Sequence, residues 1–256
     1  MKKSQIYLHR SHRKLSFSWR KLLYESMISV PVCWILTLLS LHHLTRAASH
    51  YLLRLNMPLD INSQFHLVET PLLFGHIHTP ELLGKYPTPL LTYAVFVFSI
   101  LTIAVIPKTG IPKPISIWLS FVCLVNMASA LFSIFLPDLF PYTIQAFCEI
   151  FLKTEAAIWL FIPVIMSFSF LPLPSSLVSK FLTILFTLIY AITFGLVRYI
   201  LFVLVLTNFS YLFMAVLFFC FGPFIDFIPI VGVYSVYVSY VSGKINRDLR
   251  VWNWSY

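Results

Sequence analysis

Charged residues are scarce in this chain. Asp, Glu, Lys and Arg together make up 11% of its 256 residues, whereas hydrophobic residues make up 59%. A soluble domain carries about 25% charged residues, and disordered chains and coiled coils are also rich in charge, so these three classes are excluded. The class that remains is a multi-pass membrane protein.

Cysteine and glycine are also rare, with four and seven residues. Because no two cysteines form a C-x-x-C pair, neither a disulfide framework nor a cysteine zinc site is indicated. No G-x-x-x-G motif occurs, so the helices are not expected to pack through that close backbone contact. Phenylalanine is abundant instead, at 25 residues, and we interpret these large side chains as mainly lipid-facing.

The common enzyme signatures are missing as well. The chain contains no Walker A motif, no G-x-G-x-x-G, no H-E-x-x-H and no G-x-S-x-G. Its two halves share no pattern of charges or prolines, so the inverted repeats of many transporters are not evident. No segment outside the apolar runs is suited to form a separate soluble domain. These absences favour a non-catalytic membrane protein.

Long apolar runs predict six membrane-spanning helices, because a helix needs about 20 mostly apolar residues to cross the bilayer. The sixth run would be about 51 Å long as a straight helix. Pro223 and Pro229 bracket Asp226 near its middle, so a kink or break is expected there. The predicted fold class is therefore an all-α integral membrane bundle of about six helices, the last one kinked or broken. The predicted spans are residues 22–45, 90–106, 115–136, 156–171, 181–206 and 209–242.

The distribution of basic residues predicts the orientation, since Lys and Arg collect on the cytoplasmic side. Most of these residues lie in the two tails and in every second loop between spans, so both termini are expected in the cytoplasm. The membrane is expected to be an inner or plasma membrane. The outer face receives only Arg46, Arg54, Lys85 and Lys153. The inner face receives Lys2, Lys3, Arg10, Arg13, Lys14, Arg20, Lys21, Lys108, Lys113, Lys180, Lys244, Arg247 and Arg250.

This threading divides the chain into three parts. Residues 1–21 form a basic cytoplasmic tail, residues 22–243 form the membrane domain with one large outer loop at 46–89, and residues 244–256 form a second cytoplasmic tail. The basic inner face suits the anionic headgroups of a lipid bilayer. We expect no nucleic-acid partner, because a basic tail of this kind commonly does no more than obey the orientation rule.

Arg198 and Asp226 are ionisable residues inside predicted spans, where charge is costly and marks a functional site by default. The fifth and sixth spans are joined by the short turn 207–210, so they are expected to touch. On straight helices the two residues are offset by about 12 Å, and a direct pair would need the bend near Pro223. Two interpretations stay open: a buried lock for the bundle, or a site for a substrate or ion.

The outer loop supplies weak candidates for metal ligands, namely His66, His76, His78 and Glu81. Zinc or copper needs three or four ligands that converge on one point, and an H-x-H pair in a proline-rich loop does not ensure this. The sequence therefore predicts no cofactor. The competing interpretation is a solvated loop whose histidines change charge at about pH 6.5.

Cys148 is a weak candidate for a reactive thiol, because an arginine such as Arg198 beside it would favour the thiolate. The pair resembles part of the active site of the archaeosortase and exosortase transpeptidases, multi-pass proteins that use a Cys, an Arg and a later His. The resemblance covers these two residues alone. Cys148 is followed by Glu149 rather than by small residues, and no histidine follows His78, so the base that the family would require is missing. We favour a packed thiol in an aromatic-rich segment.

Taken together, these features lead to two hypotheses about function. The first is a non-catalytic subunit, or an accessory or assembly factor, of a membrane complex, with other membrane subunits as partners. The alternative is a membrane-embedded enzyme or transporter that handles a lipid-linked or small polar substrate through Arg198 and Asp226. A set of co-purifying partners would favour the first, and an isolated oligomer with transport or transferase activity would favour the second.

Overall fold

The structure is a computed structural model, and it describes residues 13–15, 19–56, 67–72, 75–139, 142–170, 173, 175–247 and 252–254. Within these ranges, six helical segments are long and apolar enough to cross a membrane, so the chain is a multi-pass membrane protein. The segments are Leu23–Leu55, Pro89–Lys108, Lys113–Phe135, Ile144–Phe170, Leu177–Asn208 and Tyr211–Lys244.

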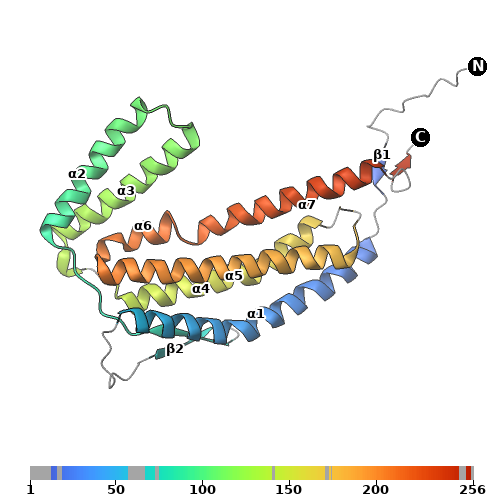
Figure 1. The fold of residues 1–256 in the computed structure, drawn as a ribbon, viewed down its shortest axis with the longest axis horizontal. Helices are drawn as coiled ribbons and strands as arrows, with labels where there is room; N and C mark the ends of the chain where they lie inside the picture. The colour runs from blue at the N-terminus through green and yellow to red at the C-terminus, as the bar shows by residue number, and fades with distance from the viewer. Residues whose placement is uncertain are drawn as a thin grey trace, which may run out of the picture.

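Four of the spans run alongside one another and form the main bundle (Figure 1). They are α1 (Trp19–Asn56), α4 (Ile144–Phe170), α5 (Leu177–Asn208) and the interrupted sixth span. Helix α1 packs against both α4 and α5, and these two pack against each other. The core between them is rich in aromatic residues, including the fully buried Trp159 and Tyr199. Burial of such large side chains supplies the main favourable packing contact of the bundle.

Helix α4 begins well before the predicted span at 156–171. Its buried residues recur at spacings of three and four, which is the period of one helix face. That face contains Cys148, Phe151, Leu152, Glu155 and Trp159. Glu155, one residue before the predicted span, therefore lies in the core of the bundle.

The second and third spans form a helical hairpin that diverges from the main bundle (Figure 1). Helix α2 (Pro89–Val105) continues into the short 3₁₀ turn η2 (Ile106–Lys108), and α3 (Lys113–Phe135) is followed by the 3₁₀ turn η3 (Pro137–Leu139). The side chain of Thr88 caps the start of α2 by accepting a hydrogen bond from the backbone of Leu91. Helices α2 and α3 pack mainly on each other, and α3 also contacts the start of the sixth span.

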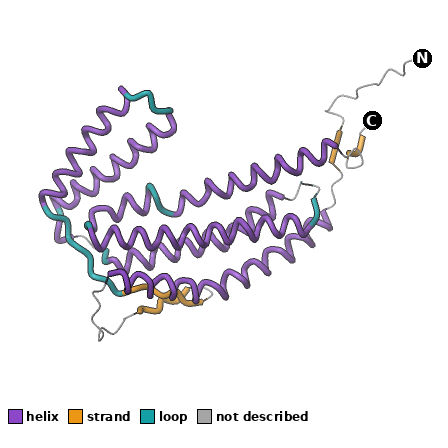
Figure 2. Tube along the Cα trace, viewed as in Figure 1, coloured by secondary structure: helices purple, strands orange, loops and turns teal. Residues whose placement is uncertain are grey.

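The predicted outer loop 46–89 is more ordered than expected. Helix α1 continues through its first part, and a two-stranded antiparallel hairpin follows (Figure 2). The strands are β2 (Leu67–Leu72) and β3 (Gly75–Pro80), with Glu69 opposite His78 in the register. Strand β3 packs against α1 and α4, so the hairpin lies along the side of the bundle, next to the C-terminal part of α1 (Figure 2).

The sixth span is broken into separate pieces. It starts with the 3₁₀ turn η4 (Tyr211–Phe213) and α6 (Met214–Phe219), and it resumes after the 3₁₀ turn η5 (Pro223–Asp226) as α7 (Phe227–Arg247). Strand β1 (Arg13–Leu15) before α1 pairs in antiparallel fashion with strand β4 (Trp252–Trp254) after α7. The start of α1 and the end of α7 therefore lie on the same side of the bundle.

Candidate functional site

Arg198 lies at the centre of a buried cluster of charged groups. Its Nη2 atom donates to Oδ2 of Asp226 at 2.6 Å and also to Oε1 of Glu155. Its Nη1 atom donates to the backbone carbonyl of Gly222 at 3.0 Å. The Arg198 side chain is 6% exposed and both carboxylates are 0% exposed. We call Glu155, Arg198 and Asp226 the Arg198 cluster.

The break in the sixth span is what brings Asp226 to Arg198. Helix α6 ends before Gly222, and η5 begins at Pro223, whose ring cannot donate a backbone hydrogen bond. A Cβ atom at position 222 would lie 1.9 Å from the carbonyl oxygen of Phe218, so only glycine fits there. A non-helical backbone inside a membrane needs internal partners, and Arg198 provides one for the Gly222 carbonyl.

Two aromatic rings enclose the guanidinium group. Its central carbon lies 5.7 Å from the ring centroid of Phe151 and 5.2 Å from that of Phe194, both within the range of a cation–π contact. The charged group thus contacts two aromatic rings in addition to its oxygen partners.

The Arg198 cluster also retains hydrogen-bonding capacity that the described residues do not use. The atoms in question are Oε2 of Glu155, Nε of Arg198 and Oδ1 of Asp226. Nε1 of the neighbouring Trp159 likewise has no hydrogen-bond partner among the described residues. Buried polar atoms without partners are rare in proteins and call for an explanation at each site.

Two members of this cluster, Arg198 and Asp226, were predicted from the sequence, and the third, Glu155, was not. The structure brings Arg198 and Asp226 into direct contact, because the break removes the axial offset that straight helices would impose. The predicted fourth span starts at residue 156, so Glu155 was left one residue outside it. The spacing of Phe151, Glu155 and Trp159 along one helix face is the signal that could have identified it.

Cys148 lies fully buried on α4, and its side chain faces Tyr199 rather than the guanidinium of Arg198. The hydroxyl of Tyr199 in turn faces Ser49 on α1. Arg198 directs both terminal nitrogens to other acceptors. The thiol is thus a packed group between three helices in this arrangement.

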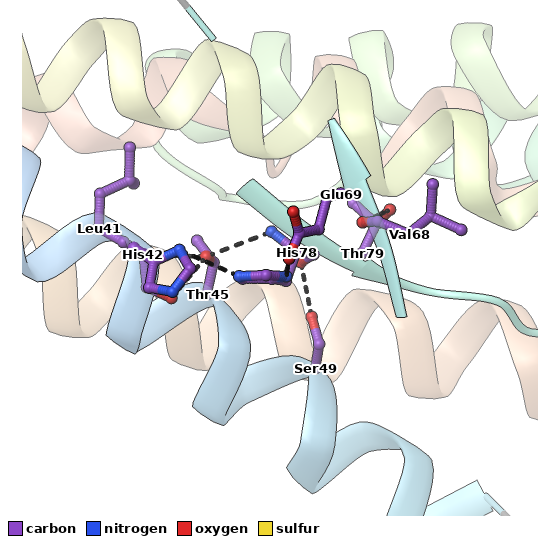
Figure 3. Close-up of polar contacts among 8 residues, drawn as sticks. All are labelled: Leu41, His42, Thr45, Ser49, Val68, Glu69, His78 and Thr79. Carbon is purple, nitrogen blue, oxygen red and sulfur yellow. Dashed lines mark hydrogen bonds and ion pairs between the residues drawn. The ribbon is translucent and has the colours of Figure 1, made fainter. Parts of the chain in front are cut away.

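A second polar site joins the β2–β3 hairpin to α1 (Figure 3). Nε2 of His78 lies 3.1 Å from Nδ1 of His42, and the hydroxyl of Ser49 donates to the carbonyl of His78 at 2.7 Å. The backbone nitrogen of His78 donates to Oγ1 of Thr45 at 3.4 Å. On the other side of the ring, Oε1 of Glu69 lies 3.7 Å from Nδ1. We call His42 and His78 the histidine pair.

The buried position of His78 changes its acid–base behaviour. Desolvation lowers the pKa of His78 below 6.5, and the nearby His42 lowers it further. The carboxylate of Glu69 acts in the opposite direction, but its side chain is 62% exposed and water screens its charge. His78 therefore stays neutral at pH values where a free histidine would begin to take up a proton.

The other candidate metal ligands lie apart from the histidine pair or outside the described ranges. His66 falls among the residues that the structure does not describe. His76 and Glu81 are exposed, whereas His78 turns inward to His42. In the described part of the chain, no group of three His, Cys, Asp or Glu side chains could hold a metal ion.

A third polar site lies near the opposite end of the bundle. Nζ of Lys180 on α5 donates to Oε2 of Glu25 on α1 at 2.9 Å, and both side chains are about nine-tenths buried. Close by, the hydroxyls of Ser29 and Ser167 lie 3.2 Å apart. Glu25 was not predicted as a site residue, because it lies at the start of the first apolar run, next to the basic tail.

Of the three sites, the Arg198 cluster is the most deeply buried. It can neutralise charge, hold the two halves of the sixth span in place and bind a proton, but its guanidinium fork is already occupied by protein oxygens. Comparison with protein-family models, with curated proteins and with solved structures finds no match for this chain.

Proposed function

We propose that this chain is a non-catalytic subunit or accessory factor of a membrane assembly. The observation that carries the proposal is the way the fold uses Arg198. Both terminal nitrogens donate to oxygens of the chain itself, and the side chain is 6% exposed. A substrate-binding arginine keeps its fork directed into an open pocket, where a carboxylate or phosphate can reach it. Arg198 in this arrangement supports structure.

The α2–α3 hairpin provides the surface for assembly. It diverges from the main bundle (Figure 1). Large apolar side chains on it are exposed, such as Phe98 at 70% and Ile117 at 71%. Inside a membrane such faces pack against lipid or against helices of another subunit. The proposed partners are other membrane subunits, and the basic face with both termini lies toward the cytoplasm and toward anionic lipids in an inner or plasma membrane.

The proposal predicts a stoichiometric partner at the hairpin. Photo-crosslinking residues placed at Phe98 and Ile117 are expected to give the same crosslinked product, with a fixed molar ratio of the two chains in native nanodiscs. Phe168 on α4 is the matched control, because it is 65% exposed on a different surface. A single-chain particle with transport or transferase activity, and equal crosslinking at all three positions, would contradict the proposal.

A second candidate function, a membrane enzyme or transporter for a small polar or lipid-linked substrate, has one observation in its favour. Nε of Arg198 and Oδ1 of Asp226 have hydrogen-bonding capacity left over. In reconstituted vesicles this candidate predicts an activity that Arg198→Lys abolishes while the fold is retained, because lysine keeps the charge but loses the planar fork. A variant that loses fold and activity together would support the structural role instead.

A further inference from the structure

The charges of the Arg198 cluster do not balance if every group is ionised. Glu155 and Asp226 would carry two negative charges, and Arg198 carries one positive charge. No other ion pair reaches either carboxylate within the residues that the structure describes, since Lys153 pairs with Glu149 and Lys180 pairs with Glu25. A net negative charge would therefore lie at a fully buried position, where its desolvation is costly.

The geometry of the two carboxylates suits a shared proton. Both direct one oxygen to the same nitrogen of Arg198, which draws the two groups together. Glu155 and Asp226 lie close enough for a hydrogen bond between them, but two carboxylates have no hydrogen to share. Their second oxygens, Oε2 and Oδ1, have no partner among the described residues. One proton would supply the missing donor and cancel the excess charge at the same time.

A proton fits this site better than a metal ion, because space beside Glu155 is very limited. A Cβ atom built on Gly195 would lie 2.9 Å from Oε2 of Glu155 and 3.1 Å from Cζ2 of Trp159. The guanidinium of Arg198 also occupies the position between the carboxylates that a cation would take. No set of three acidic, histidine or cysteine ligands is present in the described ranges.

We infer that the Arg198 cluster binds one proton between Glu155 and Asp226 at neutral pH, so that its net charge is zero. The charged groups that face the site come from three elements: Glu155 from α4, Arg198 from α5 and Asp226 from η5. The bound proton is independent of whether the chain is a subunit or a transporter.

Infrared difference spectroscopy tests this inference on the full chain. The purified protein is placed in a detergent without ester groups, so that the C=O band of a protonated carboxylic acid is not obscured by lipid. The wild type is expected to show this band at neutral pH. The band should move to lower frequency when the water is replaced by deuterium oxide. Glu155→Gln and Asp226→Asn are each expected to remove the band, because the remaining carboxylate then pairs with Arg198 and needs no proton.

Glu149→Gln is the control, since Glu149 lies on the same helix in a part-exposed pair with Lys153, and the band should persist. Each single variant at the cluster should keep a thermal midpoint near that of the wild type, because its cluster stays neutral. If one variant fails to fold, the other still decides the question. The inference is overturned if the wild type lacks the band, or if either folded variant retains it.

Discussion

Arg198 on α5 donates from Nη1 to the carbonyl of Gly222 at 3.0 Å, so one side chain is bonded to the backbone between α6 and η5. The same guanidinium binds Asp226, the last residue of η5, directly before the start of α7. A negative charge is favourable at the N-terminal end of a helix, and a positive charge is favourable beside exposed carbonyls. The charge in the fifth span and the break in the sixth span therefore stabilise each other.

Removal of Arg198 should be far more harmful than removal of Asp226. Arg198→Leu leaves two buried carboxylates without their donor, while the Gly222 carbonyl keeps only its bond from the backbone nitrogen of Ile225. We expect a loss of about 3–5 kcal/mol in the free energy of unfolding. Asp226→Leu should cost less, because Glu155 still balances Arg198. Unfolding of each variant in mixed micelles, with increasing amounts of a denaturing detergent, measures both losses in free energy.

A double-mutant cycle completes this test. Arg198→Leu with Asp226→Leu should destabilise the protein by less than the two single losses added together, since the residues are in contact. Val197→Leu, at a half-exposed neighbouring position, serves as the control and should have little effect. Strictly additive losses would show that the coupling free energy between Arg198 and Asp226 is zero, which would contradict the contact.

Gly195 is the second position where a small change should have a large effect. Gly195→Ala places a Cβ atom 2.9 Å from Oε2 of Glu155, and the rigid ring of Trp159 blocks relief on the other side. We expect a loss of about 1–3 kcal/mol in the free energy of unfolding, as for other overpacked core positions. The same chemical change at Gly232 meets no atom within 4 Å, so Gly232→Ala should be neutral or stabilising. A stable Gly195→Ala protein would contradict the packing described for Glu155.

The contact between the β2–β3 hairpin and α1 should weaken in acid. Because the pKa of His78 is lowered in the packed state, the undocked hairpin takes up a proton more readily than the docked one. Docking is then strongest above pH 6.5 and weakens as the pH falls below that value. Hydrogen exchange of the β3 amides, corrected for intrinsic rates, should speed up in acid. His78→Gln should remove this dependence, whereas His76→Gln, at an exposed position, should leave it intact.

The orientation of the chain is a separate prediction. Reporter fusions at Gly110, Ser176 and Gly243 should read as cytoplasmic, and fusions at Gly75 and Asn208 should read as external, because the basic residues lie on the first side. The pairing of β1 with β4 requires only that the two ends share a side. A cytoplasmic signal at Gly75 would reverse the whole threading.

The sequence was sufficient for the number of spans, because length and apolar content decide it locally. The end of the first span was not predictable in this way. The predicted first span ends at residue 45, directly before the charged Arg46, yet α1 continues to Asn56, and Leu52 and Leu53 on this extension are fully buried. Tertiary contact outweighed composition at this end of the helix.

Some residues of the polar sites could be predicted from the sequence and others could not, because their contacts depend on how distant segments are placed. The offset between Arg198 and Asp226 was calculated for straight helices, and a proline only indicates that a break exists, not how far it moves the chain. His42 and His78 are 36 residues apart, and no local pattern predicts that a strand will lie on the helix at that turn. Glu155 differs from these, because its helical spacing was visible in the sequence.

The divergence of α2 from the bundle has a consequence for the surrounding lipid. The span Pro89–Lys108 has 20 residues and would measure about 30 Å, so it just crosses the hydrocarbon core when upright. Because it is inclined to α5, the two cannot both be upright (Figure 1). Where α5 is upright, the bilayer beside α2 must be thinner, at a cost of a fraction of a kcal/mol for each ångström of mismatch. Short-chain lipids should therefore gather around the α2–α3 hairpin.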